Sequence, residues 1–297
     1  MRTIAAVTRT DDEITRCKRC PPGAMPAIAV ARISRAMMSR LALWAATPFL
    51  TALPPWALSE PNLHAEGAAT AGDAKLEAMP RSLEIRFALS ALPPPLRDKA
   101  TVYVLDPGKG YVRAIAGSNG QSCSVERTVW GLEYRDDHYA AICDDAAGTN
   151  SQMRLRFDVA ELRARGLTSK SAAEEIKRRV ANGVYPPPER AGISYMVAPL
   201  MRTYPGPDAK TVSTMVMPHV MYYAPNVGDA DIGGVPPPPL GPYPFVMGHG
   251  PLGYIVQPLG EHEAAQIVST ESELVKDLCA YRNYLCLSSP ETKRSEP

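Results

Sequence analysis

The stretch ATVYVLDPGKGYVRAIAGSNGQSCSV, residues 100–125, decides the fold of this chain. Residues 100–106 and 111–116 are rich in β-branched and aromatic side chains, which favour strands. The Asp-Pro-Gly-Lys-Gly sequence between them is typical of a turn, because Pro presets φ and Gly accepts a positive φ. Asn119 and Gly120 then favour a tight hairpin turn of the primed type. Together these patterns predict an antiparallel β-meander.

The segment that follows predicts a disulfide across this meander. The chain turns over residues 131–137 and returns over residues 138–144. With the reversal centred in that turn, Cys123 and Cys143 lie opposite each other on neighbouring strands, where Cβ atoms are about 5 Å apart. We therefore predict the bridge Cys123–Cys143, which is worth about 3 kcal/mol in the chain-entropy model.

Two more cysteines lie in SELVKDLCAYRNYLC, residues 272–286, which has the periodicity of a helix. Seven residues of continuous helix separate Cys279 from Cys286 by about 10 Å, beyond the limit of about 7 Å for a bridge. They pair only if the helix ends between them, so their partners stay open. Cys17 and Cys20 precede the export signal described below, and we assign them no metal or redox role.

Short helices and strands flank the meander. Helices are predicted over residues 82–92, 158–166 and 171–182, and strands over residues 192–200, 212–223 and 253–259. The third helix begins with Ser171 and Glu174 as a capping box and stops at Gly183. Because βαβ alternation is absent, the pattern favours an α+β fold over a doubly wound sheet.

Proline shapes the second half of the chain. The sequence has 30 prolines, about twice the usual share, and they cluster at residues 93–95, 186–188 and 236–239. Such clusters break helices and central strands, and residues 224–247 are expected to be mostly loop. The predicted fold is therefore α+β: an antiparallel β-meander with flanking helices, a proline-rich, loop-heavy second half and a C-terminal helix.

Residues 37–59, MMSRLALWAATPFLTALPPWALS, are typical of a bacterial signal peptide. Arg40 supplies the positive end, a short apolar core follows, and Ala57-Leu58-Ser59 is a small-x-small cleavage site. The apolar core is shorter than the roughly 20 residues of a membrane-spanning helix. The sequence thus predicts a secreted or periplasmic protein without a transmembrane anchor.

The signal peptide sets the expected division of the chain. Residues 1–36 are an upstream extension or a misassigned start, because they lack a hydrophobic periodicity. Residues 60–80 form a flexible mature N-terminus, residues 81–288 one α+β domain, and residues 289–297 a flexible tail.

Charge argues against one class of partner. Residues 1–59 carry eight Lys/Arg and three Asp/Glu, so the 32 basic and 31 acidic residues of the chain become 24 and 28 without them, a formal charge of −4. Such a balance lacks the basic footprint of nucleic-acid binding. The expected partner is a small molecule or a protein.

Four blocks of sequence carry a resemblance: GSNGQSC (117–123), ICDDAAGT (142–149), GISYMVAPLM (192–201) and MPHVMYYAPN (217–226). In these blocks the chain resembles a group of exported bacterial proteins of unassigned function, and the resemblance spans most of residues 82–286. It implies export and one continuous domain. It implies no activity.

The candidate catalytic residues are His219, His249, Asp136, Asp137 and His138. His219 lies on a strand bent by proline, and His249 lies on a glycine-rich loop that would meet it. Asp136, Asp137 and His138 place two carboxylates beside an imidazole, a set that suits a general base and its orienting acid, although Asp is also common in turns. No local zinc spacing is present, so no metal ligands are assigned and the cofactor stays unknown.

Three functions follow from these residues. The favoured one is a non-catalytic binding module, with His219, Tyr222, Tyr223 and Asn226 on its surface, because tyrosines suit polar ligand surfaces. The alternative is a hydrolase, metal-assisted in one version, that uses His219 and His249 with Asp136 or Asp137. A structural envelope component is the third.

Overall fold

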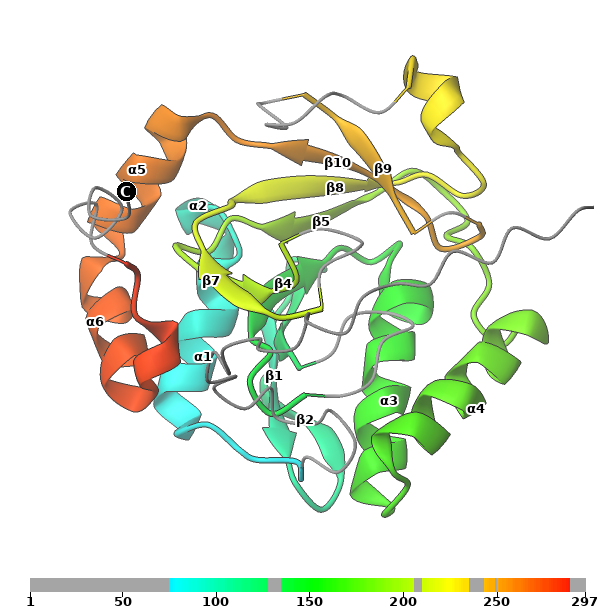
Figure 1. Cartoon of the computed structure of the whole chain (residues 1–297), viewed down its shortest axis with the longest axis horizontal. Helices are drawn as coiled ribbons and strands as arrows, with labels where there is room; N and C mark the ends of the chain where they lie inside the picture. The colour runs from blue at the N-terminus through cyan, green and yellow to red at the C-terminus, as the bar shows by residue number, and fades with distance from the viewer. Residues whose placement is uncertain (1–74, 128–134, 206–209, 235–242, 249, 289–297) are drawn as a thin grey trace, which may run out of the picture. The chain divides into compact units, whose positions relative to one another are not determined.

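The computed structural model describes residues 75–127, 135–205, 210–234, 243–248 and 250–288. An eight-stranded sheet runs through them in the order β2-β1-β3-β4-β5-β8-β10-β9 (Figure 1). Its strands are β1 (Thr101–Asp106), β2 (Gly110–Ile115), β3 (Ser122–Glu126), β4 (Ala140–Asp144), β5 (Ile193–Met196), β8 (His219–Tyr223), β9 (Phe245–Met247) and β10 (Tyr254–Pro258). A separate two-stranded ribbon joins β6 (Met201–Thr203) to β7 (Ser213–Met215).

Helices lie on both faces of the sheet. They are α1 (Arg81–Ser90), α2 (Pro94–Arg97), α3 (Arg154–Ala164), α4 (Ser169–Ala181), α5 (Glu261–Thr270) and α6 (Ser272–Tyr281). Three single turns are also present: the π-helical η1 (Thr149–Met153), which leads into α3, and the 3₁₀ turns η2 (Asp229–Ile232), between β8 and β9, and η3 (Asn283–Leu285), after α6. The helices and the mostly antiparallel sheet confirm the α+β class.

One step of the meander differs from the prediction. β1 and β2 form the expected hairpin, but β3 pairs with β1, and the two strands are parallel. The chain crosses the start of β1 instead of folding back on β2, and the amides of Ser118 and Asn119 both donate to the Lys99 carbonyl at 2.7 and 3.1 Å. Gly117 permits this crossing, because a Cβ there would lie 2.3 Å from the backbone of Thr101.

The predicted disulfide is confirmed. Cys123 on β3 and Cys143 on β4 are direct partners in the antiparallel register, with their Cα atoms 4.0 Å apart. Both residues are fully buried. The bridge fixes these two strands where they face α1.

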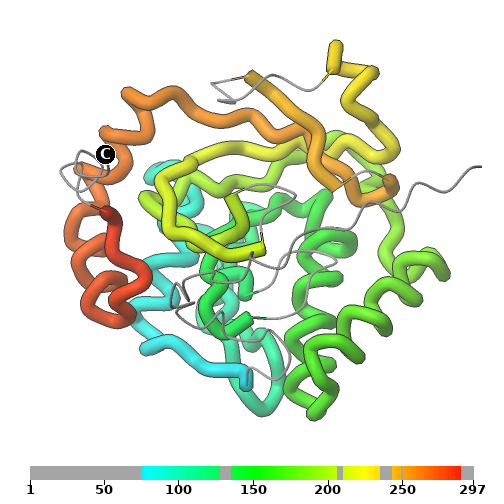
Figure 2. The backbone as a smooth tube through the Cα atoms, in the orientation of Figure 1, coloured from blue at the N-terminus to red at the C-terminus, as the bar shows by residue number. Residues whose placement is uncertain are grey.

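Helices α1 and α6 pack together on that face of the sheet (Figure 2). Phe87, Leu92, Leu278 and Leu285 are fully buried members of this apolar core. Because α6 ends at Tyr281, the chain turns back through η3, and the open pairing is resolved as the bridge Cys279–Cys286, with its Cα atoms 4.3 Å apart.

The opposite face of the sheet packs on α3 near its β2 edge. Phe157 of α3 contacts the rings of Tyr103 and Tyr111, with centroids 4.9 and 4.6 Å apart. Further along the same face, the ribbon β6–β7 covers a cluster that is rich in methionine. Between α3 and that ribbon lies the polar network described below.

The predicted boundaries fall mostly outside the described residues. This is so for residues 1–36, 37–59 and 289–297, and for the proline cluster at 236–239. The end of the 60–80 segment is described, and there Met79 is buried against α1. In the described ranges, no helix is long and apolar enough to cross a bilayer.

Candidate functional site

Arginine side chains hold both carboxylate residues of the predicted catalytic set. The Asp137 carboxylate accepts from Arg135 Nε at 2.7 Å and from Arg202 at 3.2 Å. Partial burial opposes ionisation, but the hydrogen bonds and charges of the two arginines lower the pKa of the Asp137 carboxyl. The backbone carbonyl of Asp136 accepts from Arg127 at 2.8 Å. Asp137 is thus an ionised structural partner of two cations.

His138 lies in the core, and both of its ring nitrogens have partners. Nδ1 donates to the Glu126 carbonyl at 3.2 Å, and Nε2, unprotonated in that tautomer, accepts from the Thr203 hydroxyl at 3.0 Å. Burial lowers the pKa of His138 to about 3. The imidazole therefore stays neutral and joins the start of β4 to β3 and β6.

His219 is also buried, at the first position of β8. Nδ1 donates to the Met217 carbonyl at 2.8 Å, and burial lowers the pKa of the imidazole. Its predicted partner His249 lies outside the described residues. Within the described residues, His219 makes no hydrogen bond to Asp136 or Asp137, and no group of three His, Cys, Asp or Glu side chains is arranged to hold a metal.

The four residues predicted as one ligand surface are divided between the two sides of β8. Side chains alternate along a strand, so His219 and Tyr223 point to the buried side, and Tyr222 points to the exposed side with 47% of its surface accessible. Asn226 follows the strand in an αL conformation, with φ 62°, and its backbone N–H donates to the Gly250 carbonyl at 2.7 Å.

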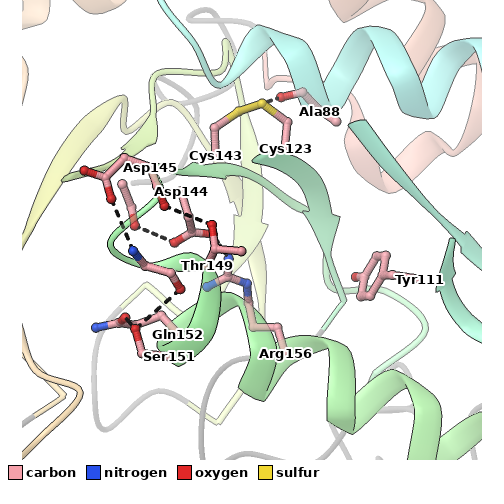
Figure 3. A network of polar contacts seen from close by, with 12 residues as sticks. Ala88, Tyr111, Cys123, Cys143, Asp144, Asp145, Thr149, Ser151, Gln152 and Arg156 are labelled. Carbon is pink, nitrogen blue, oxygen red and sulfur yellow. Dashed lines mark hydrogen bonds and ion pairs between the residues drawn. A yellow bond between two sulfur atoms is a disulfide. The ribbon is translucent and has the colours of Figure 1, made fainter. Parts of the chain in front are cut away.

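The buried side of β8 meets a polar network centred on Asp144 (Figure 3). Asp144 has no exposed surface and pairs with Arg156, the third residue of α3. Its other carboxylate oxygen accepts from the Ser194 hydroxyl at 2.7 Å and from Tyr223 at 3.4 Å. One carboxylate therefore joins β4, β5, β8 and α3.

The loop after Asp144 brings the backbone into the same place. The Asp145 carboxylate accepts from the amides of Ala147 at 2.8 Å and Ile193 at 3.2 Å, which ties the loop to β5. A Cβ on Gly148 would lie 2.0 Å from the Tyr223 hydroxyl, so glycine is needed for this close approach. The π-helical turn η1 follows at once and aims Arg156 at Asp144.

Burial dominates the electrostatics of this network. Burial raises the pKa of Glu126, at the end of β3, to about 7, with Arg156 opposing the shift and Asp144 adding to it. Burial raises the pKa of the Tyr223 and Tyr254 hydroxyls as well, and the negative charge of Asp144 raises both further. The two tyrosines are therefore neutral hydrogen-bonding groups at physiological pH.

This arrangement is suited to anchoring strands. Ser194 is fully buried and donates its hydroxyl to the Asp144 carboxylate, which already pairs with Arg156. This hydrogen bond is not the contact with a free general base, such as a neutral histidine, that activates a serine nucleophile. Arg156 and Ser194 were not predicted as site residues, because neither belongs to a local motif. Alternation in GISYM would place Ser194 opposite the apolar Ile193 and Tyr195, whereas the structure buries Ser194 and Met196.

Two concavities formed by described residues lie elsewhere. A cleft of about 330 Å³ separates α1 and α2 from α5 and α6, with Arg97 and Glu271 in its walls. A second, of about 380 Å³, lies between α3 and α4. No protein-family model, curated protein or solved structure matches this chain.

Proposed function

We propose that this chain is an exported, non-catalytic binding module that recognises a protein partner through the exposed side of β8. Its two disulfides support a location in an oxidising compartment, where such bonds persist. The described candidates for general acid–base chemistry, His138, His219 and Asp137, are buried or paired within the fold. These observations favour recognition over catalysis.

The observation that carries this proposal is the position of Tyr222. It is 47% exposed on a strand in the interior of the sheet, and its direct partners on the neighbouring strands are Ile193 and Ile255. Ile193 and Ile255 are partly exposed, so the three side chains form an apolar row with Tyr222 at its centre, and tyrosine is enriched at protein interfaces. The row lies on a sheet face and outside the two clefts, which favours a protein partner over a small molecule.

Photo-crosslinking from position 222 tests the proposal. Tyr222 is replaced by p-benzoylphenylalanine in the intact chain expressed in its own host, and Tyr243, which is 64% exposed, is replaced in the same way as the control. We expect a discrete adduct from position 222 that excess unlabelled protein suppresses and excess Ile255→Glu protein does not. Crosslinks as strong from position 243, or adducts that both competitors suppress equally, would contradict the proposal.

The hydrolase and envelope alternatives stay predictions. No described contact favours either, because the imidazole of His219 has no carboxylate partner and His249 lies outside the described residues.

A further inference from the structure

We propose that the methionine-lined end of strands β5 and β8 binds Cu(I), with His219 Nε2 and the thioether sulfurs of Met196 and Met221 as ligands. This site is on the buried side of β8, opposite Tyr222, and is independent of the protein-binding surface proposed above. Three features carry the inference: the strand register, the state of the imidazole and the soft chemistry of the surrounding side chains.

The register places the three ligands together. Met196 is the direct cross-strand partner of His219, and Met221 lies two residues further along β8, on the same side of the sheet. Directly opposed residues have Cβ atoms about 5 Å apart, and diagonal neighbours lie about 7–8 Å apart, within reach of long side chains. Unbranched methionine side chains are flexible enough to converge on one ion from these positions.

The imidazole of His219 is prepared for a metal. Its Nδ1–H is fixed on the Met217 carbonyl at 2.8 Å, which leaves the lone pair on Nε2. Among the described residues, Nε2 has no hydrogen-bond partner. A histidine that donates one ring N–H to a backbone carbonyl and offers the other nitrogen is the usual arrangement of a metal ligand.

The surroundings select a soft cation. Met201 and Met215, a cross-strand pair of the ribbon β6–β7, belong to the same cluster as Met196 and Met221, and Met217 packs against it. The described cysteines are all in disulfides, so the soft ligands of this cluster are thioethers. Thioethers favour Cu(I), whereas Mg²⁺ and Ca²⁺ require oxygen ligands.

Competition with the Cu(I) chelator bicinchoninate tests the site under anaerobic, reducing conditions mild enough to keep the disulfides. The intact chain carries Cys17→Ser and Cys20→Ser, so that these thiols do not bind the ion. The variants are Met196→Leu, Met221→Leu and His219→Gln. Leucine conserves the volume and removes the sulfur, and such changes usually cost under about 1.5 kcal/mol of stability. Met79→Leu, at an equally buried methionine in the other core, is the matched control.

We expect the protein to bind one Cu(I) per chain, and we expect X-ray absorption at the copper edge to show sulfur and nitrogen ligands. The affinity for Cu(I) should be at least about 10-fold lower in each ligand variant. The Met79→Leu protein should bind as the unmodified protein does. Failure of the chain to compete with bicinchoninate, or full affinity in the two leucine variants with unchanged thermal unfolding, would overturn the proposal. So would an equal loss in the control, because the binding would then be nonspecific.

Discussion

Strands β5 and β8 lie side by side in the sheet, but the two ends of the pair differ in chemistry. At one end, Ser194 and Tyr223 hydrogen-bond to a buried carboxylate that pairs with Arg156. At the other end, Met196 faces His219, whose Nε2 has no partner among the described residues. At the polar end the Asp144 carboxylate is fully engaged in joining strands to α3, whereas at the methionine end the His219 ring makes one hydrogen bond, through Nδ1.

Removal of the charge at the polar end should have the largest effect. Asp144→Asn leaves the Arg156 guanidinium buried, with 6% of its side chain exposed, and without its ion-pair partner, while Glu126 is the acidic group that still acts on it. We expect the free energy of unfolding to fall by about 3–5 kcal/mol, measured by denaturant unfolding. The double variant Asp144→Asn/Arg156→Met should be more stable than Asp144→Asn alone. A loss under 1 kcal/mol, on the order of that at an exposed pair, would mean that the network does not anchor the strands.

In the metal-free protein, the stability of the methionine end should depend on the volume of the side chains more than on the presence of sulfur. Met221→Ala removes buried side-chain atoms and should lower the free energy of unfolding by about 2–5 kcal/mol, whereas Met221→Leu should cost less than about 1.5 kcal/mol. Thermal and denaturant unfolding of both variants measure this. If Met221→Leu were as damaging as Met221→Ala, the sulfur would have a structural role that the packing does not reveal.

The disulfide Cys123–Cys143, next to Asp144, should contribute to the free energy of unfolding. Cys123 and Cys143 are 20 residues apart, and replacing both with Ala should cost about 3 kcal/mol in the chain-entropy model. Replacing Cys279 and Cys286, which are seven residues apart, should cost about 2 kcal/mol. Urea unfolding of the two double variants measures the difference. The opposite order would show that the shorter loop restrains more of the chain than its length indicates.

The last expected effect is a pair of opposite pH dependences, which is measured as a change of slope and not as a loss at one pH. Glu126 has a folded pKa raised from 4.5 to about 7, so the fold holds its proton more tightly, and its stabilising contribution is lost as pH rises from 4.5 to 7. His219 has a lowered folded pKa, so stability is lost as pH falls below 6.5, where the unfolded chain takes up a proton.

Glu126→Gln should therefore flatten the loss of stability toward neutral pH, and His219→Asn should flatten the loss toward acid. Denaturant unfolding between pH 4.5 and 8 measures both slopes. Glu84 and His138 keep part of each slope in the variants, because burial raises the pKa of the first to about 7 and lowers the pKa of the second to about 3. If the slope of unfolding free energy against pH changed in the same direction in both variants, the opposite roles of Glu126 and His219 would be contradicted.

Local signals predicted much of the fold. The Asp-Pro-Gly turn formed the β1–β2 hairpin, and α4 stops at Gly183, which has a φ of +69°. The predicted start of this helix was wrong: Thr168 caps α4 by accepting a hydrogen bond from the Ser171 backbone amide, in place of the predicted capping box at Ser171. The parallel β1–β3 pair was missed, because Asn-Gly predicts a reversal without saying which strand the chain then joins.

The candidate sites were harder to predict than the fold. His219 was identified from its proline-bent strand, but its burial and its cross-strand methionine depend on a register set by residues far apart in sequence. The Asp144 network joins residues 144, 156, 194 and 223, and none of them carries a local motif. Polar partners of this kind become visible only when strands are paired.

The crossing at Gly117 has a consequence for the order of assembly. β1, β2, β3 and β4 are consecutive in the chain and adjacent in the sheet, and the first bridge joins residues only 20 apart. Short loops close quickly and at low entropic cost. A chain that emerges N-terminus first can therefore pair these four strands and bring Cys123 and Cys143 together before α6, whose leucines complete their apolar core, has emerged.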